Sequence, residues 1–229
     1  MRFFDRALVD GRSIRVRSTE ETDGDFARDD ADHELDARRR SVVDLPWVWL
    51  TQVHGDGCVD VDAVGLEDAC GALADSSVTR RTDLALSIQT ADCVPIVLWS
   101  LDGVIAAVHA GWQGLEAGVI ESAARSMRTH SSAPLHAFIG PSIGPECYEF
   151  GAEDLDRLEA RFGPVIRAKT SDGRPALDVR AGVISELLRN GVVVDVDDDV
   201  CTACAGGFFS HRARADTARH ATVIWIEES

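Results

Sequence analysis

The sequence predicts an α+β fold, a single domain with a mixed β-sheet core flanked by helices. Short apolar runs that favour strands occur among amphipathic segments that favour helices, without the strict strand–helix alternation of a parallel α/β fold. The 229 residues are enough to bury one sizeable hydrophobic core. Because no Pro- or Ser-rich linker divides the chain, we assign residues 1–229 to one domain.

The N-terminal third changes character at about residue 42. Residues 18–40 are polar and charged, and they predict a loop followed by a short, mostly solvated helix. Residues 47–54 are apolar and rich in side chains that favour strands, and the run stops at Gly55 and Gly57. We therefore expect a strand that ends in a turn at His54.

The central and C-terminal parts of the chain contain further periodic segments. Continuous apolar runs predict strands covered on both faces over 84–89, 94–99 and 104–109. Pro95 cannot donate a ladder hydrogen bond, so we place it at the start of its strand. The remaining patterns predict helices over 115–129, 152–162 and 176–190, and strands over 135–139, 192–196 and 221–226.

Composition excludes several classes of function. Acidic residues outnumber basic ones 39 to 23, and a net charge of −16 repels nucleic acids and anionic membranes. No apolar run approaches the ~20 residues of a membrane span. The first residues are followed by no apolar signal region, so we expect a cytoplasmic protein with reduced thiols, a monomer or a weak homo-oligomer.

Three potential metal ligands stand at the ends of apolar runs: His54, Cys93 and His109. Imidazole and thiolate are ligands that Zn²⁺ prefers, and three protein ligands leave a fourth position open for water or substrate. The spacing carries no regular signature, so histidines that merely end strands remain an alternative. Gly111 and Gly114 precede a predicted helix whose free N–H groups could hold an anion such as phosphate.

Several strings in this chain closely resemble the YfiH-like laccase-domain family. They are Gln52-Val53-His54-Gly55, Ala91-Asp92-Cys93-Val94-Pro95, Val108-His109-Ala110-Gly111-Trp112-Gln113-Gly114, residues 74–79, residues 139–149, Cys201-Thr202, and Phe208-Phe209-Ser210-His211-Arg212. The resemblance runs from about residue 47 to 226 and implies a single α+β laccase domain. Members of this family are often described as polyphenol oxidases and also as zinc-dependent purine nucleoside phosphorylases.

The resemblance implies a metal centre and an activity. His54, Cys93 and His109 would bind a catalytic Zn²⁺, with Cys93, His109 and Asp92 as the catalytic residues. The implied activity is phosphorolysis of adenosine, inosine, guanosine and methylthioadenosine, together with adenosine deaminase activity. Asp92 would orient a ligand or carry a proton.

The resemblance also implies where substrate and phosphate bind. Ser210 and Arg212 would belong to the pocket, and we expect Arg212 and the helix start at Gly111 and Gly114 to hold the phosphate. Two arginines common in the family are replaced here, near Glu21 and at Gln113.

Other chemistries remain open. Copper in the same three-ligand site would give a laccase-like polyphenol oxidase, although the seven histidines include no His-x-His pair of a multicopper centre. A cysteine hydrolase would use Cys93 as nucleophile and His109 as base, with Asp92 nearby. Cys201 and Cys204 form a single CxxC that could be half of a structural zinc site or a redox pair. Because no second pair is present, we interpret them as ordinary structural cysteines.

Overall fold

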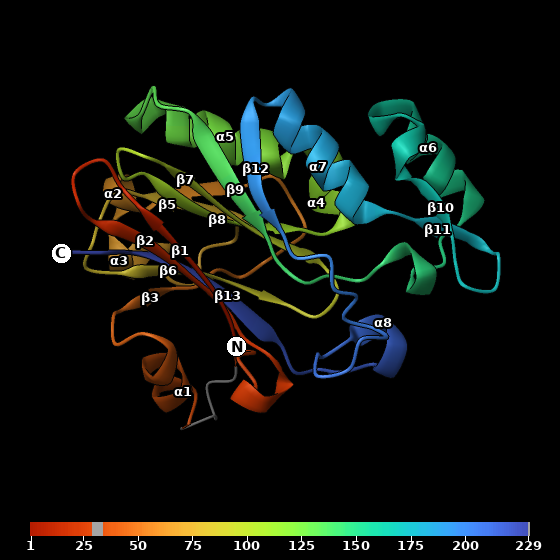
Figure 1. The fold of residues 1–229 in the computed structure, drawn as a ribbon, viewed down its shortest axis with the longest axis horizontal. Helices are drawn as coiled ribbons and strands as arrows, with labels where there is room; N and C mark the ends of the chain where they lie inside the picture. Colours follow the sequence, from red (N-terminus) through yellow and green to blue (C-terminus); the bar gives the residue numbers. More distant parts are fainter. Residues whose placement is uncertain (29–33, 229) are drawn as a thin grey trace.

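The computed structural model describes residues 1–28 and 34–228, which form stacked layers of sheet and helix (Figure 1). In chain order the elements are β1 Arg2–Ala7, β2 Ser13–Ser18, the 3-10 helix η1 Glu21–Asp23, α1 Leu35–Val42, β3 Trp47–Val48, β4 Cys58–Asp60, α2 Val61–Val64, α3 Leu66–Ala69, β5 Ser76–Thr79, β6 Ala85–Thr90, β7 Val94–Ser100, β8 Ile105–Ala110, α4 Trp112–Ala117, α5 Val119–His130, β9 Leu135–Ile139, η2 Pro145–Cys147, α6 Ala152–Phe162, η3 Pro164–Ile166, β10 Arg167–Lys169, β11 Pro175–Leu177, α7 Val179–Arg189, β12 Val192–Asp197, α8 His211–Arg214 and β13 His220–Glu227.

A six-stranded mixed sheet lies at the centre, in the order β12-β9-β7-β8-β5-β4. Both faces of this sheet are buried, as its strand β7 illustrates. Successive side chains of a strand point to opposite faces of the sheet. Ile96 and Leu98 belong to the core beneath α4, α5 and α7, whereas Val97 and Trp99 belong to the core shared with the second sheet. Continuous apolar strands are the expected result of this double coverage.

The second sheet has five strands in the order β1-β2-β13-β6-β3. Its C-terminal strand β13 pairs antiparallel with β2 on one side and β6 on the other, so both ends of the chain are joined in one sheet (Figure 1). A third core lies on its outer face near α1, where the rings of Phe26 and Trp47 stack with centroids 6.0 Å apart.

The α+β class with mixed sheets and flanking helices is confirmed, and the mixed strands divide between two stacked sheets. The strands predicted from apolar runs at 84–89, 94–99 and 104–109 are β6, β7 and β8, and the helix predicted over 152–162 is α6.

Three boundaries were wrong. The helix predicted over 115–129 is two helices, α4 and α5, because Gly118 between them adopts a φ of 103°, outside helical geometry. The helix predicted over 176–190 begins only at Val179, since the preceding residues form β11. The strand predicted over 47–54 ends at Val48, and the chain then bends toward His54.

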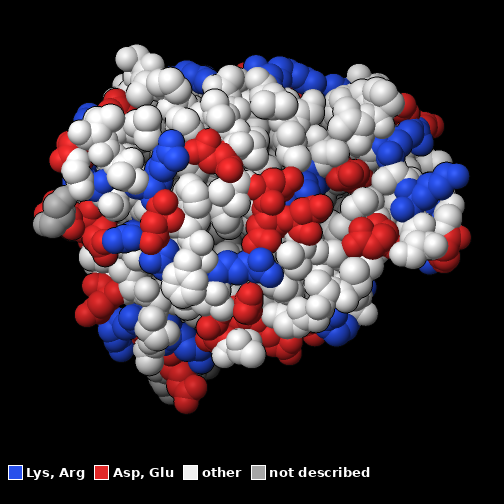
Figure 2. Space-filling model, viewed as in Figure 1, with Lys and Arg blue, Asp and Glu red and all other residues white. Residues whose placement is uncertain are grey.

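Acidic and basic side chains are interspersed over the face drawn in Figure 2. Arg2 Nη1 lies 2.9 Å from Asp198 Oδ1, and Arg180 pairs with Asp197. Arginines of β1 and α7 therefore pair with the acidic side chains at the end of β12. No helix in the described ranges has the length and apolar character needed to cross a bilayer.

Candidate metal and active site

The structure brings His54, Cys93 and His109 together from three separate segments. Their ligand atoms all lie within 4.8 Å of one another, and Cys93 Sγ is 3.7 Å from His54 Nε2. The two imidazole rings meet edge to face with centroids 4.7 Å apart. His54 is exposed, Cys93 half-buried and His109 buried, so the cluster is open to solvent on the His54 side.

Asp75 anchors the loop that carries His54. Its carboxylate accepts backbone hydrogen bonds from Val53 at 3.2 Å, His54 at 2.9 Å and Gly55 at 2.7 Å. His54 has a φ of 59°, a left-handed conformation that a non-glycine residue adopts at a cost. Three hydrogen bonds to one buried carboxylate therefore hold the ligand in a conformation that its own sequence disfavours.

The same carboxylate orients His109. His109 Nδ1 lies 2.8 Å from Asp75 Oδ1, and the His109 backbone N–H donates to the Asp75 carbonyl at 2.7 Å. A ring bonded through Nδ1 presents Nε2 to the cluster, which is the usual arrangement of a metal-binding histidine backed by a carboxylate. Burial opposes ionisation of Asp75, but hydrogen bonds from His109 and Gly55 outweigh it and lower the pKa of the carboxyl.

Cys93 is the cysteine whose surroundings favour the thiolate. Burial opposes its ionisation, but His109 and His54 outweigh this and lower the pKa of Cys93 to about 6. Burial likewise opposes the charged form of His109, but Cys93 and Asp75 raise its pKa to about 9. The other five cysteines, all within the described ranges, have raised thiol pKa values, with burial as the first cause.

Gly111 and Gly114 allow the backbone to approach this cluster closely. A Cβ on Gly111 would lie 2.6 Å from His54 Cδ2 and 3.1 Å from Cys93 Sγ. A Cβ on Gly114 would lie 3.1 Å from the Gly55 carbonyl oxygen. Both glycines thus make room for the His54 loop. Gly111 precedes α4 as predicted, but Gly114 lies inside this helix because α4 begins at Trp112. Their predicted role in holding phosphate stays a prediction.

A pocket of about 530 Å³ opens over the cluster and is lined by all three ligands. Gln52, Arg28 and Arg219 also line it. Gln52 is held by two hydrogen bonds to the backbone of Gln89, one donated at 2.8 Å and one accepted at 2.9 Å. The lining of the pocket therefore combines a histidine–thiolate cluster, two arginines and a fixed amide.

Asp92 precedes the ligand Cys93 and connects it to the C-terminal part of the chain. It is buried and has a φ of 94°. One carboxylate oxygen accepts from the Thr202 hydroxyl at 2.7 Å, and the other accepts from the Arg212 backbone N–H at 2.7 Å. One oxygen thus fixes the turn after β12 and the other fixes the start of α8 to the β6–β7 connection. The predicted catalytic role of Asp92 remains a prediction.

Ser210 and Arg212 lie at the start of α8. Ser210 is fully buried, and its hydroxyl caps the helix by accepting from the Ala213 N–H at 3.1 Å. The Arg212 guanidinium lies 4.6 Å from the centroid of the Tyr148 ring and donates to the Glu149 carbonyl at 2.8 Å. These contacts position Arg212 on the Tyr148 side of α8, and the roles predicted for both residues in substrate binding stay predictions.

Comparison with known proteins places the chain in a family. Residues 15–227 match the family model described as multi-copper polyphenol oxidoreductase laccase. The chain belongs to this laccase family. The resemblance noted from its sequence motifs is therefore confirmed.

Two relatives of this chain carry names that refer to nucleosides. A purine nucleoside phosphorylase of Streptomyces coelicolor is 39% identical over 200 residues, covering 86% of this chain and 82% of the relative. A purine nucleoside phosphorylase of Mycobacterium tuberculosis is 37% identical over 201 residues, covering 83% of this chain and 78% of the relative.

Solved structures share the fold. A Neisseria meningitidis protein of the DUF152 family superposes with a TM-score of 0.81 at 23% identity, over 100% of both chains. YlmD from Geobacillus stearothermophilus superposes with a TM-score of 0.74 at 25% identity, over 95% of this chain and 93% of that one.

Sequence reasoning missed three residues of the site. Asp75 stands inside one of the family strings, but nothing in the string shows that it bonds to His109. Arg28 and Arg219 are far apart in the sequence and line the same pocket because β13 pairs with β2 and β6.

Proposed function

We propose that this protein is a zinc-dependent purine nucleoside phosphorylase whose metal is held by His54, Cys93 and His109. The observation that carries the proposal is the convergence of these three ligand atoms within 4.8 Å at an open pocket. The names of relatives at 37–39% identity supply the reaction class.

The donor set fits Zn²⁺. Two imidazoles and one thiolate are borderline and soft ligands, and three protein ligands with an open side are typical of a catalytic rather than a structural zinc site. Asp75 supplies the carboxylate that such a histidine commonly requires. Copper also accepts imidazole and thiolate ligands and is the alternative ion.

The pocket suits a nucleoside and an anion. Its volume of about 530 Å³ falls within the roughly 300–1,000 Å³ of small-molecule sites. Arg28 and Arg219 supply positive charge at its wall, which a phosphate needs in a protein of net charge −16. We propose these two arginines as the principal phosphate contacts, with Arg212, Ser210, Gly111 and Gly114 as the contacts implied by the family resemblance.

In phosphorolysis, a phosphate oxygen bonds to C1′ of the ribose while the bond from C1′ to the base nitrogen breaks and the base leaves with the electron pair. When bound, the ion would supply a Lewis acid at the open side of its ligands. The arginines would hold the phosphate close to C1′, and Asp75 would keep His109 in place throughout. Asp92 remains our candidate for orienting a ligand or carrying a proton.

The substrate range is a finer proposal. We propose adenosine, inosine, guanosine and methylthioadenosine as substrates, with a deaminase activity in which water replaces the C6 amino group of adenosine and ammonia leaves. We further propose that the protein is cytoplasmic, a monomer or weak homo-oligomer, without a nucleic-acid or membrane partner. Its charge of −16 supports the last of these.

A second candidate function has its own structural support. Cys93, His109 and Asp75 form a row of thiol, imidazole and carboxylate like that of a cysteine hydrolase, with Asp75 in the place predicted for Asp92. The second imidazole, His54, favours the metal because a thiol nucleophile needs only one base. A thiol enzyme would keep its activity in a strong chelator, whereas a zinc enzyme would lose it.

The experiment combines products and metal content. Purified protein is incubated with adenosine or inosine and inorganic phosphate, and ribose 1-phosphate, inosine and hypoxanthine are followed while bound zinc and copper are measured. We expect ribose 1-phosphate with zinc bound. The absence of this product under zinc-replete conditions would overturn the phosphorylase proposal, and stoichiometric copper without zinc would favour the oxidase.

A further inference from the structure

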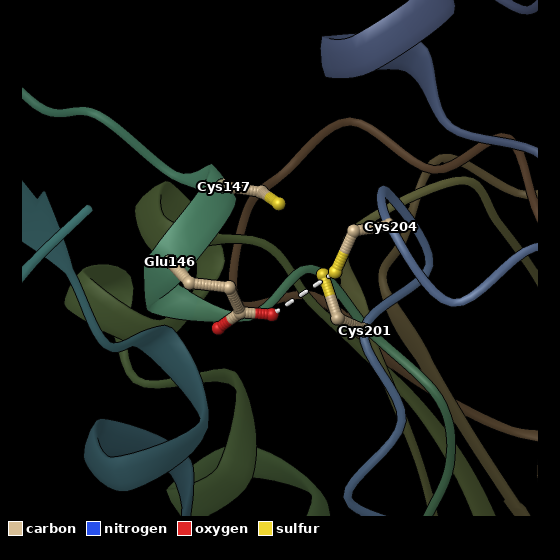
Figure 3. Close-up of side chains that lie close together, drawn as sticks. All are labelled: Glu146, Cys147, Cys201 and Cys204. Atoms are coloured by element: carbon tan, nitrogen blue, oxygen red, sulfur yellow. Dashed lines mark hydrogen bonds between the residues drawn. The ribbon is translucent and has the colours of Figure 1, made fainter. Parts of the chain in front are cut away.

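A second cluster of potential metal ligands lies outside the pocket. The thiols of Cys147, Cys201 and Cys204 and the carboxylate of Glu146 have ligand atoms that all lie within 4.8 Å of one another. The residues come from η2 and from the turn after β12, and Figure 3 shows their side chains directed toward a common centre. All three cysteines are free thiols.

Backbone contacts hold the two segments in register. Ser142 donates to the Val200 carbonyl at 3.2 Å, and Thr202 donates to the Ser142 carbonyl at 3.1 Å. The Gly144 N–H donates to Cys201 Sγ at 3.1 Å. Hydrogen bonds from the backbone to sulfur are common around metal-bound thiolates, where they stabilise the negative charge.

Glu146 reaches the cluster because position 144 is glycine. Its carboxylate folds back over the backbone, and a Cβ on Gly144 would collide with both of its oxygens. From this position Glu146 Oε1 accepts a hydrogen bond from Cys204 Sγ at 3.4 Å, the contact drawn as a dashed line in Figure 3. The fourth donor is therefore aimed at the three sulfurs.

We propose that Cys147, Cys201, Cys204 and Glu146 form a second metal site that binds a thiophilic divalent cation such as Zn²⁺. Three thiolates and one carboxylate provide the four donors of a closed tetrahedral site. Zinc–sulfur bonds of ~2.3 Å would place neighbouring sulfurs ~3.8 Å apart, which is compatible with ligand atoms that all lie within 4.8 Å of one another. Cys204 is exposed, which gives the ion a path from solvent.

A metal ion bound at this site would stabilise the turn after β12, which contacts residues next to the catalytic pocket. Thr202, between two of the ligands, donates to Asp92, which precedes the pocket ligand Cys93. Arg214 of α8 donates to the Ala203 carbonyl at 3.1 Å. A cation bound here would therefore fix the turn that positions both Asp92 and α8.

The test separates the two clusters by metal content. In a Cys93→Ala variant, which removes a ligand of the first cluster, metal analysis at saturating zinc should still find one bound equivalent. Adding Cys147→Ser and Cys204→Ser should remove it, whereas Cys70→Ser, outside both clusters, should not. Because the measured quantity is the number of zinc ions bound per protein, the result does not depend on whether the protein catalyses phosphorolysis.

A second variant and a spectroscopic signal distinguish loss of the metal site from misfolding of the protein. Glu146→Gln keeps all three thiols, so Co²⁺ should still give strong thiolate-to-cobalt absorption while zinc affinity falls about 10-fold or more. Loss of zinc from the Cys93→Ala protein, or zinc retained after removal of Cys147 and Cys204, would overturn the proposal. So would a mass under non-reducing conditions that shows these thiols joined in a disulfide.

Discussion

The Nδ1–H of His109 donates a hydrogen bond to Asp75 at 2.8 Å, and both residues are buried. The same carboxylate accepts the backbone N–H groups of Val53, His54 and Gly55. One side chain thus orients one candidate metal ligand and fixes the loop of another. Asp75 is therefore a positioning residue for the whole cluster.

Replacing Asp75 by Asn should weaken zinc binding about 10- to 100-fold, the usual effect of removing a carboxylate behind a metal-binding histidine. Zinc affinity is measured by competition with a chromogenic chelator, and activity should return at high zinc concentration. Asp102→Asn, which alters a carboxylate bonded to Ser100 and Ser131, serves as the control. Unchanged zinc affinity in Asp75→Asn would contradict the role given to this residue.

Gly111→Ala should reduce zinc binding without unfolding the protein. The backbone of Gly111 has a φ of −72°, which alanine tolerates, but the new Cβ would lie 2.6 Å from His54 Cδ2. His54 must move away, so zinc affinity should fall by at least about 10-fold. Gly151→Ala is the matched control, because its Cβ would meet nothing within 4 Å. A variant with normal zinc affinity but a raised KM for phosphate would instead support the anion-binding role.

Arg219→Gln should raise the KM for phosphate about 10-fold or more, because a charge-assisted hydrogen bond contributes about 1.5–3 kcal/mol. Arg219 lines the pocket, although its Nη1 donates to the backbone carbonyls of Asp216, Thr217 and Ala218. Arg212→Gln should have a smaller effect, since Arg212 is not among the residues that line the pocket and its side chain packs on Tyr148. Steady-state kinetics with varied phosphate distinguishes the two, and thermal unfolding checks that each variant is folded. A larger effect of Arg212→Gln would instead indicate that phosphate binds at the start of α8.

His220 should make the protein less stable in mild acid. Burial lowers its pKa from the ordinary 6.5 to about 4, and its Nε2 accepts the Phe209 N–H at 2.6 Å. The unfolded chain therefore binds this proton more readily. The stabilisation is complete above pH 6.5 and declines as the pH falls toward 4, by about 2 kcal/mol at pH 5.

Urea unfolding at pH 7 and pH 5 measures this effect. The free energy of unfolding of His220→Leu should fall by about 2 kcal/mol less than that of the wild type between these two pH values. Carboxylates shared by both proteins cancel in this comparison. An equal fall in the two proteins would show that His220 is protonated in the folded state.

Much of the fold was predictable because its central strands are buried on both faces. The apolar runs of β6, β7 and β8 therefore stood out, whereas β2 was missed although Ile14 and Val16 alternate with Arg15 and Arg17. The break between α4 and α5 depends on the positive φ of Gly118, which composition does not reveal. The predicted helix boundaries were wrong where a local backbone conformation interrupted the helix although the apolar pattern continued.

The candidate site was predictable in its ligands but not in its supports. His54, Cys93 and His109 stood out through residue type and motif, and the structure brings them together. Asp75 could not be paired with His109 because the contact depends on the register of β5 against β8. The cluster around Glu146 was missed because the CxxC at Cys201 finds its further ligands in η2, a segment much earlier in the chain.

The central claim is that phosphorolysis depends on a metal held by His54, Cys93 and His109. The most direct measurement is the rate of ribose 1-phosphate formation from inosine and phosphate by protein stripped with a chelator, before and after Zn²⁺ is restored. We predict that activity disappears on stripping, returns with zinc, and does not return in Cys93→Ala. Full phosphorolysis by the metal-free protein, or by Cys93→Ala, would contradict the account.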